Sequence, residues 1–129
     1  MPTMLTGSCL CGATAFEIDG DLAPGTICHC GQCRKQTSHV YASTHIAKAA
    51  LRMTRDDQLR WYAASPMARR GFCGACGSVL FWNPNDEDRI SVSMGALNDP
   101  HEGRLTRHIF TAHKGRHYEI GDDLPQDQD

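Results

Sequence analysis

The residues of this sequence that are best suited to chemistry are its seven cysteines. Three of them crowd into the stretch CHCGQC at residues 28–33, and the other four form two short pairs that lie far apart in the chain. An odd number of cysteines does not suit a disulfide framework, and an intracellular chain keeps its thiols reduced. Short spacings of this kind are instead typical of metal ligands. The seven are Cys9, Cys11, Cys28, Cys30, Cys33, Cys73 and Cys76.

The two outer pairs, Cys9 with Cys11 and Cys73 with Cys76, together supply four sulfur ligands. Zinc binds four thiolates in a tetrahedron, and such a closed site has no position left for a substrate. Gly77 follows the second pair and allows the chain to curl around a metal ion. We therefore predict a structural zinc site that ties the start of the chain to the segment near residue 75.

Cys28, Cys30 and Cys33 are then left as three sulfurs on one short turn. Catalytic zinc is usually held by three protein ligands and keeps its fourth position open. His29, between two of these cysteines, is expected to point away from the metal, whereas His39 could serve as a fourth ligand or as a neighbouring donor. Two interpretations stay open: a reactive site with a vacancy, and a structural site that a histidine closes.

A zinc ion with three thiolates carries one net negative charge, so its Lewis acidity should be muted. Such a site suits a further soft ligand, a thiol whose proton the metal helps to remove, better than it suits the production of hydroxide. Nucleobase deaminases need a glutamate two residues after the first ligand, where this sequence has Cys30. The adjacent Arg34 and Lys35 could bind the carboxylates of an anionic thiol or remain solvated surface cations.

Two other uses of cysteine fit the sequence less well. Cys30 with Cys33, and Cys73 with Cys76, have the spacing of a thioredoxin-like redox pair. Such a pair opens a helix within a βαβ pattern, and the sequence shows no such pattern. Cysteines also bind iron–sulfur clusters, but these spacings match neither ferredoxin pattern closely.

The elements that must position these cysteines are predicted to be short strands. Alternating or apolar runs bounded by Gly, Pro, Asn and Asp recur along the chain and indicate a mainly β domain, a sandwich or a barrel. Residues 46–53 have a weaker helical alternative. The expected strands lie at 13–18, 25–28, 40–46, 59–62, 78–82, 89–94 and 104–111.

Length and charge limit the remaining possibilities. A chain of 129 residues is typical of one domain, and a formal charge of −2 with scattered histidines gives no broad basic face for nucleic acid. No apolar run approaches the about 20 residues that span a bilayer, so we expect a cytoplasmic protein with no membrane partner. Residues 119–129 carry five carboxylates and no cation, which predicts a solvated, mobile acidic tail after a domain of residues 1–118.

Taken together, the cysteine motifs resemble the family of glutathione-dependent formaldehyde-activating enzymes, which also includes centromere-protein-V-like members. The resemblance covers nearly the whole chain. Ser38 stands where many members carry glycine, and His117 stands where a tryptophan is common. The matching stretches are GSCLCGA at 7–13, CHCGQCRK at 28–35, FCGACGS at 72–78, HIF at 108–110, YEI at 118–120 and DLP at 123–125.

This resemblance implies a single-domain β-tent fold with zinc knuckles, as in methionine sulfoxide reductase B. It also implies two zinc ions: a structural one on the four outer cysteines and a second, catalytic one on Cys28, Cys30 and Cys33. The implied reaction joins glutathione to formaldehyde as S-hydroxymethylglutathione, which is a carbon–sulfur lyase reaction run in reverse. The thiol would bind at the open fourth position of the three-cysteine zinc. The alternative is a non-catalytic, zinc-stabilised binding module.

Overall fold

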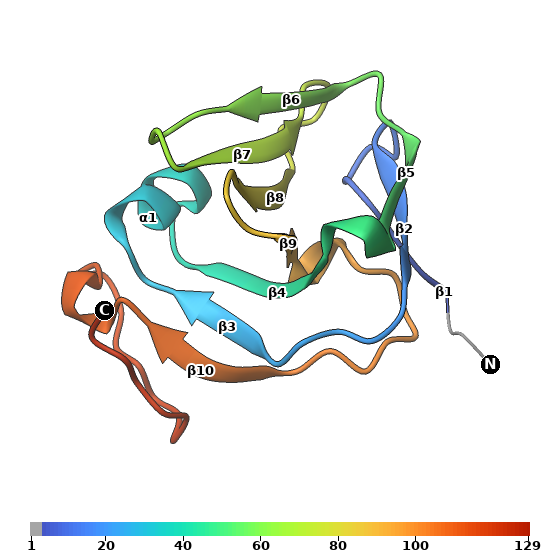
Figure 1. Ribbon diagram of the computed structural model, residues 1–129. Helices are drawn as coiled ribbons and strands as arrows, with labels where there is room; N and C mark the ends of the chain where they lie inside the picture. The colour runs from blue at the N-terminus through green and yellow to red at the C-terminus, as the bar shows by residue number, and fades with distance from the viewer. Residues whose placement is uncertain (1–3) are drawn as a thin grey trace.

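The computed structural model describes residues 4–129, and over this range the chain is built mainly from short strands (Figure 1). One α-helix, α1 (Gly31–Thr37), and three 3₁₀ turns, η1 (Lys48–Ala50), η2 (Met94–Ala96) and η3 (Thr111–His113), complete the described elements. The strands are β1 (Met4–Ser8), β2 (Ala15–Asp19), β3 (Gly25–Cys28), β4 (Tyr41–Ala47), β5 (Leu51–Arg55), β6 (Leu59–Tyr62), β7 (Ala68–Cys73), β8 (Val79–Pro84), β9 (Arg89–Ser93) and β10 (Leu105–Ile109).

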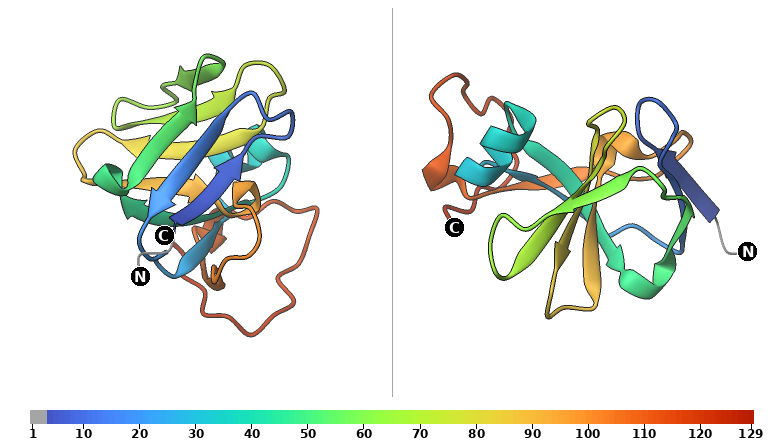
Figure 2. Two further views of the ribbon diagram at one scale, coloured as in Figure 1. Left: turned by 90° about the vertical axis from the view of Figure 1, so that its right-hand side faces the viewer. Right: turned by 90° about the horizontal axis from the view of Figure 1, so that it is seen from above.

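The described strands form two sheets, which confirms the prediction of a mainly β protein. One sheet has three strands in the order β1-β2-β5, and the other has seven in the order β10-β3-β4-β9-β8-β7-β6. Neighbouring strands are antiparallel except at one edge, where β10 runs parallel to β3. Figure 2 shows the strands of the smaller sheet crossing over those of the larger one.

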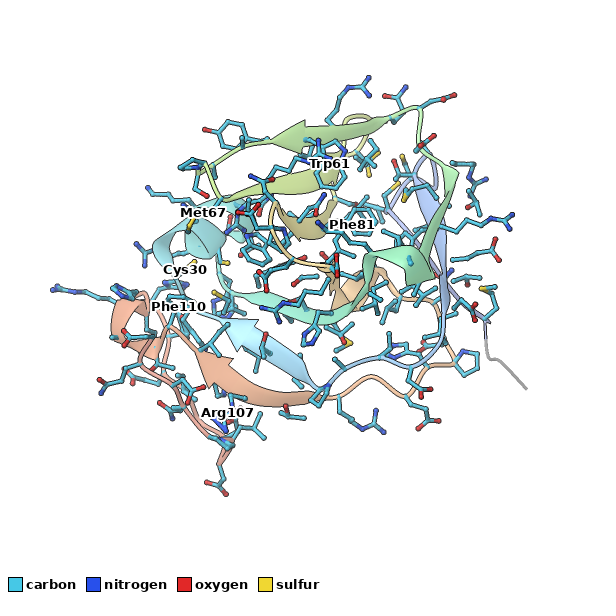
Figure 3. All side chains as sticks on the ribbon, viewed as in Figure 1. Cys30, Trp61, Met67, Phe81, Arg107 and Phe110 are labelled. Atoms are coloured by element: carbon cyan, nitrogen blue, oxygen red, sulfur yellow. The ribbon has the colours of Figure 1, made fainter. Side chains whose placement is uncertain are left out.

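The main core lies between the two sheets because each sheet turns an apolar face inward. Phe16 and Ile18 alternate along β2 and are buried against Leu80 and Phe81 of β8 and Val92 of β9. The rings of Phe16 and Phe81 meet edge to face with centroids 5.2 Å apart, a favourable geometry for an aromatic pair. Figure 3 shows Phe81 in this interior, away from Cys30 beside α1.

The helix α1 was not predicted, because the sequence shows no sign of a helix after the cysteine cluster. It is only seven residues long, and Cys33 is its one buried residue, so no apolar periodicity marks it. Cys30 is the N-cap, and its sulfur accepts a hydrogen bond from the Cys33 amide. Ser38 ends the helix in the left-handed region at φ 71°, a conformation that favours glycine. No helix within residues 4–129 is long and apolar enough to cross a membrane.

The helical alternative for residues 46–53 is wrong. The segment instead contains the end of β4, the turn η1 and the first part of β5. Pairing with β2 holds β5 extended, with Ile18 opposite Leu51 and Phe16 opposite Met53. Strands β1, β5 and β7 were not predicted because their short apolar stretches are interrupted by Gly, Arg or Thr.

Most residues of the acidic C-terminal segment are exposed, as expected of a solvated tail, but the segment also packs along β10, which the sequence did not predict. The His108 amide donates to the Pro125 carbonyl at 2.9 Å, and the Asp127 amide donates to the His108 carbonyl at 2.8 Å. Arg107 forms an ion pair with Asp127 at 2.8 Å. Charge counting within the tail alone could not reveal these partners on β10. Residues 1–3 lie outside the described residues, and a domain boundary at residue 118 stays a prediction.

Candidate metal centres

The four outer cysteines lie together at one end of the interface between the two sheets. Their four sulfur atoms are all within 4.8 Å of one another. The sulfurs of Cys9 and Cys11 are 3.7 Å apart, and those of Cys11 and Cys73 are 4.0 Å apart. A zinc–sulfur distance of about 2.3 Å gives a tetrahedron with edges of about 3.8 Å. The predicted grouping of these four residues therefore matches the geometry that a tetrahedral metal ion requires.

Two similar turns present these sulfurs. After Cys9, Gly12 adopts φ 81° and donates to the Cys9 carbonyl; after Cys73, Gly77 adopts φ 83° and donates to the Cys73 carbonyl. A side chain is strained in this conformation, so glycine is the suitable residue at both positions. The Ser78 hydroxyl lies 3.2 Å from the Cys76 sulfur, and this hydrogen bond contributes most to lowering the pKa of Cys76 to about 5.

The second group contains Cys28, Cys30 and Cys33, whose sulfurs also lie within 4.8 Å of one another. Cys28 ends β3, Cys30 caps α1 and Cys33 lies in the first turn of that helix. Cys28 and Cys33 are buried, whereas Cys30 is half-buried and so faces the solvent side of the cluster. Hydrogen bonds from the Cys28 and Cys33 side chains, with further ones from the Cys33 and Gln32 amides, lower the pKa of Cys30.

His29 points away from the cysteine sulfurs, as expected. Its Nδ1 lies 2.5 Å from the hydroxyl of Tyr118, and its Nε2 lies 2.8 Å from Nδ1 of His108. The other ring nitrogen of His108 lies 2.9 Å from a carboxylate oxygen of Asp122. The backbone between Cys28 and Cys30 is thus anchored to the C-terminal part of the chain. Burial is the main cause of the lowered pKa of His29.

His39 does not join the three-cysteine group in the part of the chain that the structure describes. It is exposed, and its Nδ1 lies 3.2 Å from Nε2 of His117. Its ring also meets the ring of Tyr118 edge to face, with centroids 4.5 Å apart. The cluster therefore contains three protein sulfurs, with His39 placed among the neighbouring rings.

Arg70 is a functional candidate that the sequence-based analysis left without a role. Its side chain is buried, and its two terminal nitrogens lie 3.6 and 3.7 Å from the Cys33 sulfur. The same nitrogens donate to the side-chain oxygens of Gln36 and Gln32. No local sequence signal marks Arg70, because the exposed Arg69 stands next to it and its partner Cys33 is 37 residues away.

A basic hollow of about 580 Å³ opens next to this cluster. Arg34, one residue after Cys33, donates to the carbonyl of His113 at 3.1 Å. Lys114 donates to the Gly115 and Tyr118 carbonyls, and its ammonium lies 4.7 Å from the centre of the Tyr118 ring. No carboxylate is among the described residues that line the hollow. These residues are Arg34, His113, Lys114, Gly115, Arg116 and His117.

Comparison with protein families identifies the family to which this cysteine pattern belongs. The model of the family described as glutathione-dependent formaldehyde-activating enzyme matches residues 4–113, a range that contains all seven cysteines. The chain belongs to this family. The resemblance of the cysteine motifs is thereby confirmed.

Solved structures give further support for the fold of this formaldehyde-activating family member. A crystal structure of a Rhodobacter sphaeroides protein, determined as a structural-genomics target, is similar with a TM-score of 0.64 and 23% sequence identity. The match covers 74% of this chain and 90% of the other. No curated protein matches the sequence.

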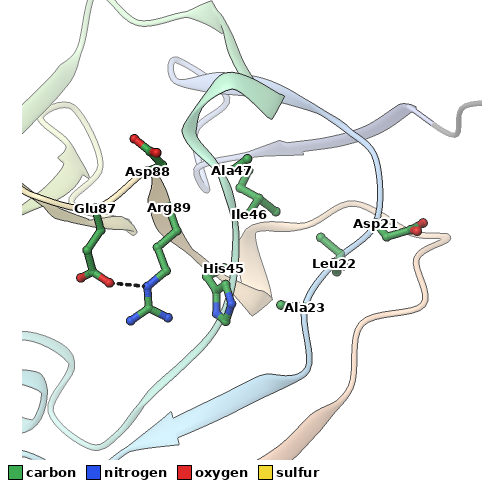
Figure 4. Close-up of a pocket in the computed structure, with 9 residues that line it drawn as sticks. All are labelled: Asp21, Leu22, Ala23, His45, Ile46, Ala47, Glu87, Asp88 and Arg89. Atoms are coloured by element: carbon green, nitrogen blue, oxygen red, sulfur yellow. Dashed lines mark hydrogen bonds and ion pairs between the residues drawn. The ribbon is translucent and has the colours of Figure 1, made fainter.

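A larger hollow of about 730 Å³ is not part of the cysteine cluster in this family member (Figure 4). It lies at the end of β4 opposite to Tyr41, which pairs with Cys28. Glu87 and Arg89 form an ion pair at its edge, and no cysteine lines it. The lining residues are Asp21, Leu22, Ala23, His45, Ile46, Ala47, Glu87, Asp88 and Arg89.

Proposed function

We propose that this family member joins a small thiol, glutathione or a close analogue, to formaldehyde or another small aldehyde at Cys28, Cys30 and Cys33. In the lyase direction the same site would cleave the carbon–sulfur bond of the adduct. One observation carries the proposal. The sulfurs of these three cysteines lie within 4.8 Å of one another, and no fourth protein ligand joins them among residues 4–129. Membership of a family named for this chemistry supports it.

The residues present fit zinc at both cysteine groups. Four gathered sulfurs provide a complete tetrahedral ligand set, and three provide an incomplete one with a half-buried member on the solvent side. A zinc ion bound at the three-cysteine site would supply a position at which an incoming thiol loses its proton. We propose a structural role for the first metal ion and a catalytic role for the second.

The chemistry is the addition of a thiol across a carbonyl group. The carbon–sulfur bond forms, the carbon–oxygen double bond becomes a single bond, and the thiol proton is transferred to the carbonyl oxygen, so no oxidant or reductant is needed. The protein's contribution would be to hold both reactants beside Cys30 in a reactive orientation, because such positioning can supply a large part of a rate enhancement. Buried Cys28 and Cys33 provide a fixed base for that geometry.

The basic hollow is proposed to bind a carboxylate of the thiol substrate. It is linked to the cysteine loop through Tyr118, whose ring meets that of His117 with centroids 4.6 Å apart and stacks on His29 at 5.5 Å. Arg34 and His39, which the sequence indicated, border this region. Lys35 stays a proposed substrate contact, although it is exposed and lines neither hollow.

Replacing Arg116 by alanine should raise the KM for glutathione by up to about fivefold, because an exposed charge pair contributes at most about 1 kcal/mol. The KM for 2-mercaptoethanol, a thiol without a charge, should stay unchanged. Arg55→Ala is the matched control and should have no effect, because Arg55 is exposed on β5 and lines neither hollow. An equal effect of Arg116→Ala on both thiols would contradict a role in binding the carboxylate.

The proposed function is tested by exchange NMR of glutathione with formaldehyde. The wild-type protein should accelerate adduct formation and breakdown beyond the uncatalysed rate, and folded Cys30→Ser protein, which keeps the four-cysteine site, should not. Equal rates with intact protein and with buffer would exclude catalysis of this reaction. In that case the non-catalytic binding module, with two metal sites inert to added thiol, becomes the better description.

A further inference from the structure

We propose that Arg70 is a positioning residue that balances the charge of the three-cysteine site and so allows it to bind a further thiolate. Arg70 projects from β7 toward α1, and its terminal nitrogens lie 3.6 and 3.7 Å from the sulfur of Cys33. The part of this inference that concerns an incoming thiol rests on the proposed function. The part that concerns metal binding does not.

The guanidinium of Arg70 is held in a defined orientation. Gln32 and Gln36 lie one turn apart on α1, and each accepts a hydrogen bond from a different terminal nitrogen, at 3.2 and 2.9 Å. Both nitrogens are therefore shared between an amide oxygen and the sulfur of Cys33. Lysine could not reproduce this planar, forked arrangement, because its ammonium is a single point of charge.

The charge of Arg70 has no carboxylate partner among residues 4–129. The side chain is only 6% exposed, and no ion pair in the described part of the chain includes it. A buried charge is ordinarily paired, because its removal from water is costly. The thiolates of the cysteine site are thus the counter-charge that the structure offers.

This pairing changes the net charge of the site. A divalent metal ion with three thiolates has one net negative charge, and Arg70 brings the sum to zero. A thiolate entering as a fourth ligand then leaves one negative charge in place of two. A difference of one charge has a large effect on the electrostatic free energy of a buried site, because screening by water is weak there. The four-cysteine site has no comparable cation among its described contacts, in keeping with a site that accepts no further ligand.

The test uses the full chain loaded with cobalt, whose sulfur charge-transfer bands report on thiolate ligation. Arg70→Met should lower the metal affinity of the three-cysteine site by about 10- to 100-fold, the usual effect of removing a partner of a metal ligand. The spectral change caused by glutathione should weaken by about as much. The four-cysteine site serves as an internal reference and should be unchanged. Arg69→Met is the matched control, since Arg69 points outward over Trp61.

Arg70→Lys and Arg70→Gln keep the proposal testable if Arg70→Met loses both metals by unfolding. The lysine variant should retain part of the metal affinity because it keeps the charge, and the glutamine variant should lose it. Equal affinities in a folded Lys and Gln pair, or wild-type metal affinity in folded Arg70→Met, would overturn the inference. A third outcome is that Arg70→Met weakens metal binding while glutathione changes the spectrum of no variant, the wild type included. This outcome would support charge balancing by Arg70 and contradict the proposed function.

Discussion

Replacing Cys73 by serine is expected to remove the metal ion from the four-cysteine site and to unfold most of the protein. Cys73 is fully buried at the end of β7 and belongs to the main core. Cys9 and Cys11 follow β1 of the small sheet, whereas Cys73 ends β7 of the large sheet and Cys76 lies in the turn between β7 and β8. A metal ion held by all four would therefore connect the two sheets.

The size of the effect follows from two free energies. Structural zinc contributes about 10–16 kcal/mol of apparent binding free energy in zinc-finger peptides. A domain of ordinary stability has only about 5–15 kcal/mol to lose. Thermal unfolding followed by circular dichroism, with zinc content measured in parallel, checks the prediction. Ala75→Ser is the control, because Ala75 is exposed in the same turn and supplies no sulfur. A folded Cys73→Ser protein with the wild-type unfolding temperature would show that this site is not structural.

Cys30→Ser should have the opposite profile, with the fold kept and the reaction lost. Serine is one of the best N-cap residues, so it can replace the cysteine that caps α1 with little loss of stability. Its hydroxyl is a poor replacement for a thiolate ligand, because zinc binds softer sulfur in preference. We expect the zinc content to fall from two ions to one and the adduct exchange to return to the uncatalysed rate.

The measurements that check this second prediction are metal analysis, exchange NMR and a thermal unfolding curve on one preparation. Retention of the metal in the four-cysteine site serves as the control for intact folding. Wild-type exchange rates in a Cys30→Ser protein that has lost one zinc ion would place the reaction elsewhere. Loss of both ions together would mean that Cys30 supports the whole fold, which its half-buried position does not suggest.

The sequence was sufficient to predict the division of the cysteines into four and three. Ligand spacing is a local property, and four sulfurs complete a zinc tetrahedron whatever fold brings them together. Most strands were also predictable from alternation, and β3, β4 and β6 lie within two residues of the expected ranges. The partition and the mainly β class therefore came from information that short stretches contain.

The remaining features depend on contacts between distant segments. Arg70 meets Cys33 across 37 residues, and His29 meets Tyr118 across 89. Neither pairing has a local pattern, so neither could be predicted from spacing or charge. The same reason explains why the packing of the tail was not predicted, because Asp127 contacts Arg107 only after the chain has turned back along β10. The helix α1 was missed because its residues are mostly polar and too few for a period to be visible.

The anchoring of His29 also has a consequence for the order in which the site is assembled during synthesis. All seven candidate ligands have been made once the ribosome reaches residue 76, whereas His108, Tyr118 and Asp122 follow 32 to 46 residues later. Strand β10, the edge strand that completes the seven-stranded sheet, is among these late residues. A nascent chain thus has all seven candidate ligand sulfurs before it has the side chains that fix the backbone between Cys28 and Cys30. The alignment of the three-cysteine loop is therefore a late step that belongs to the C-terminal segment.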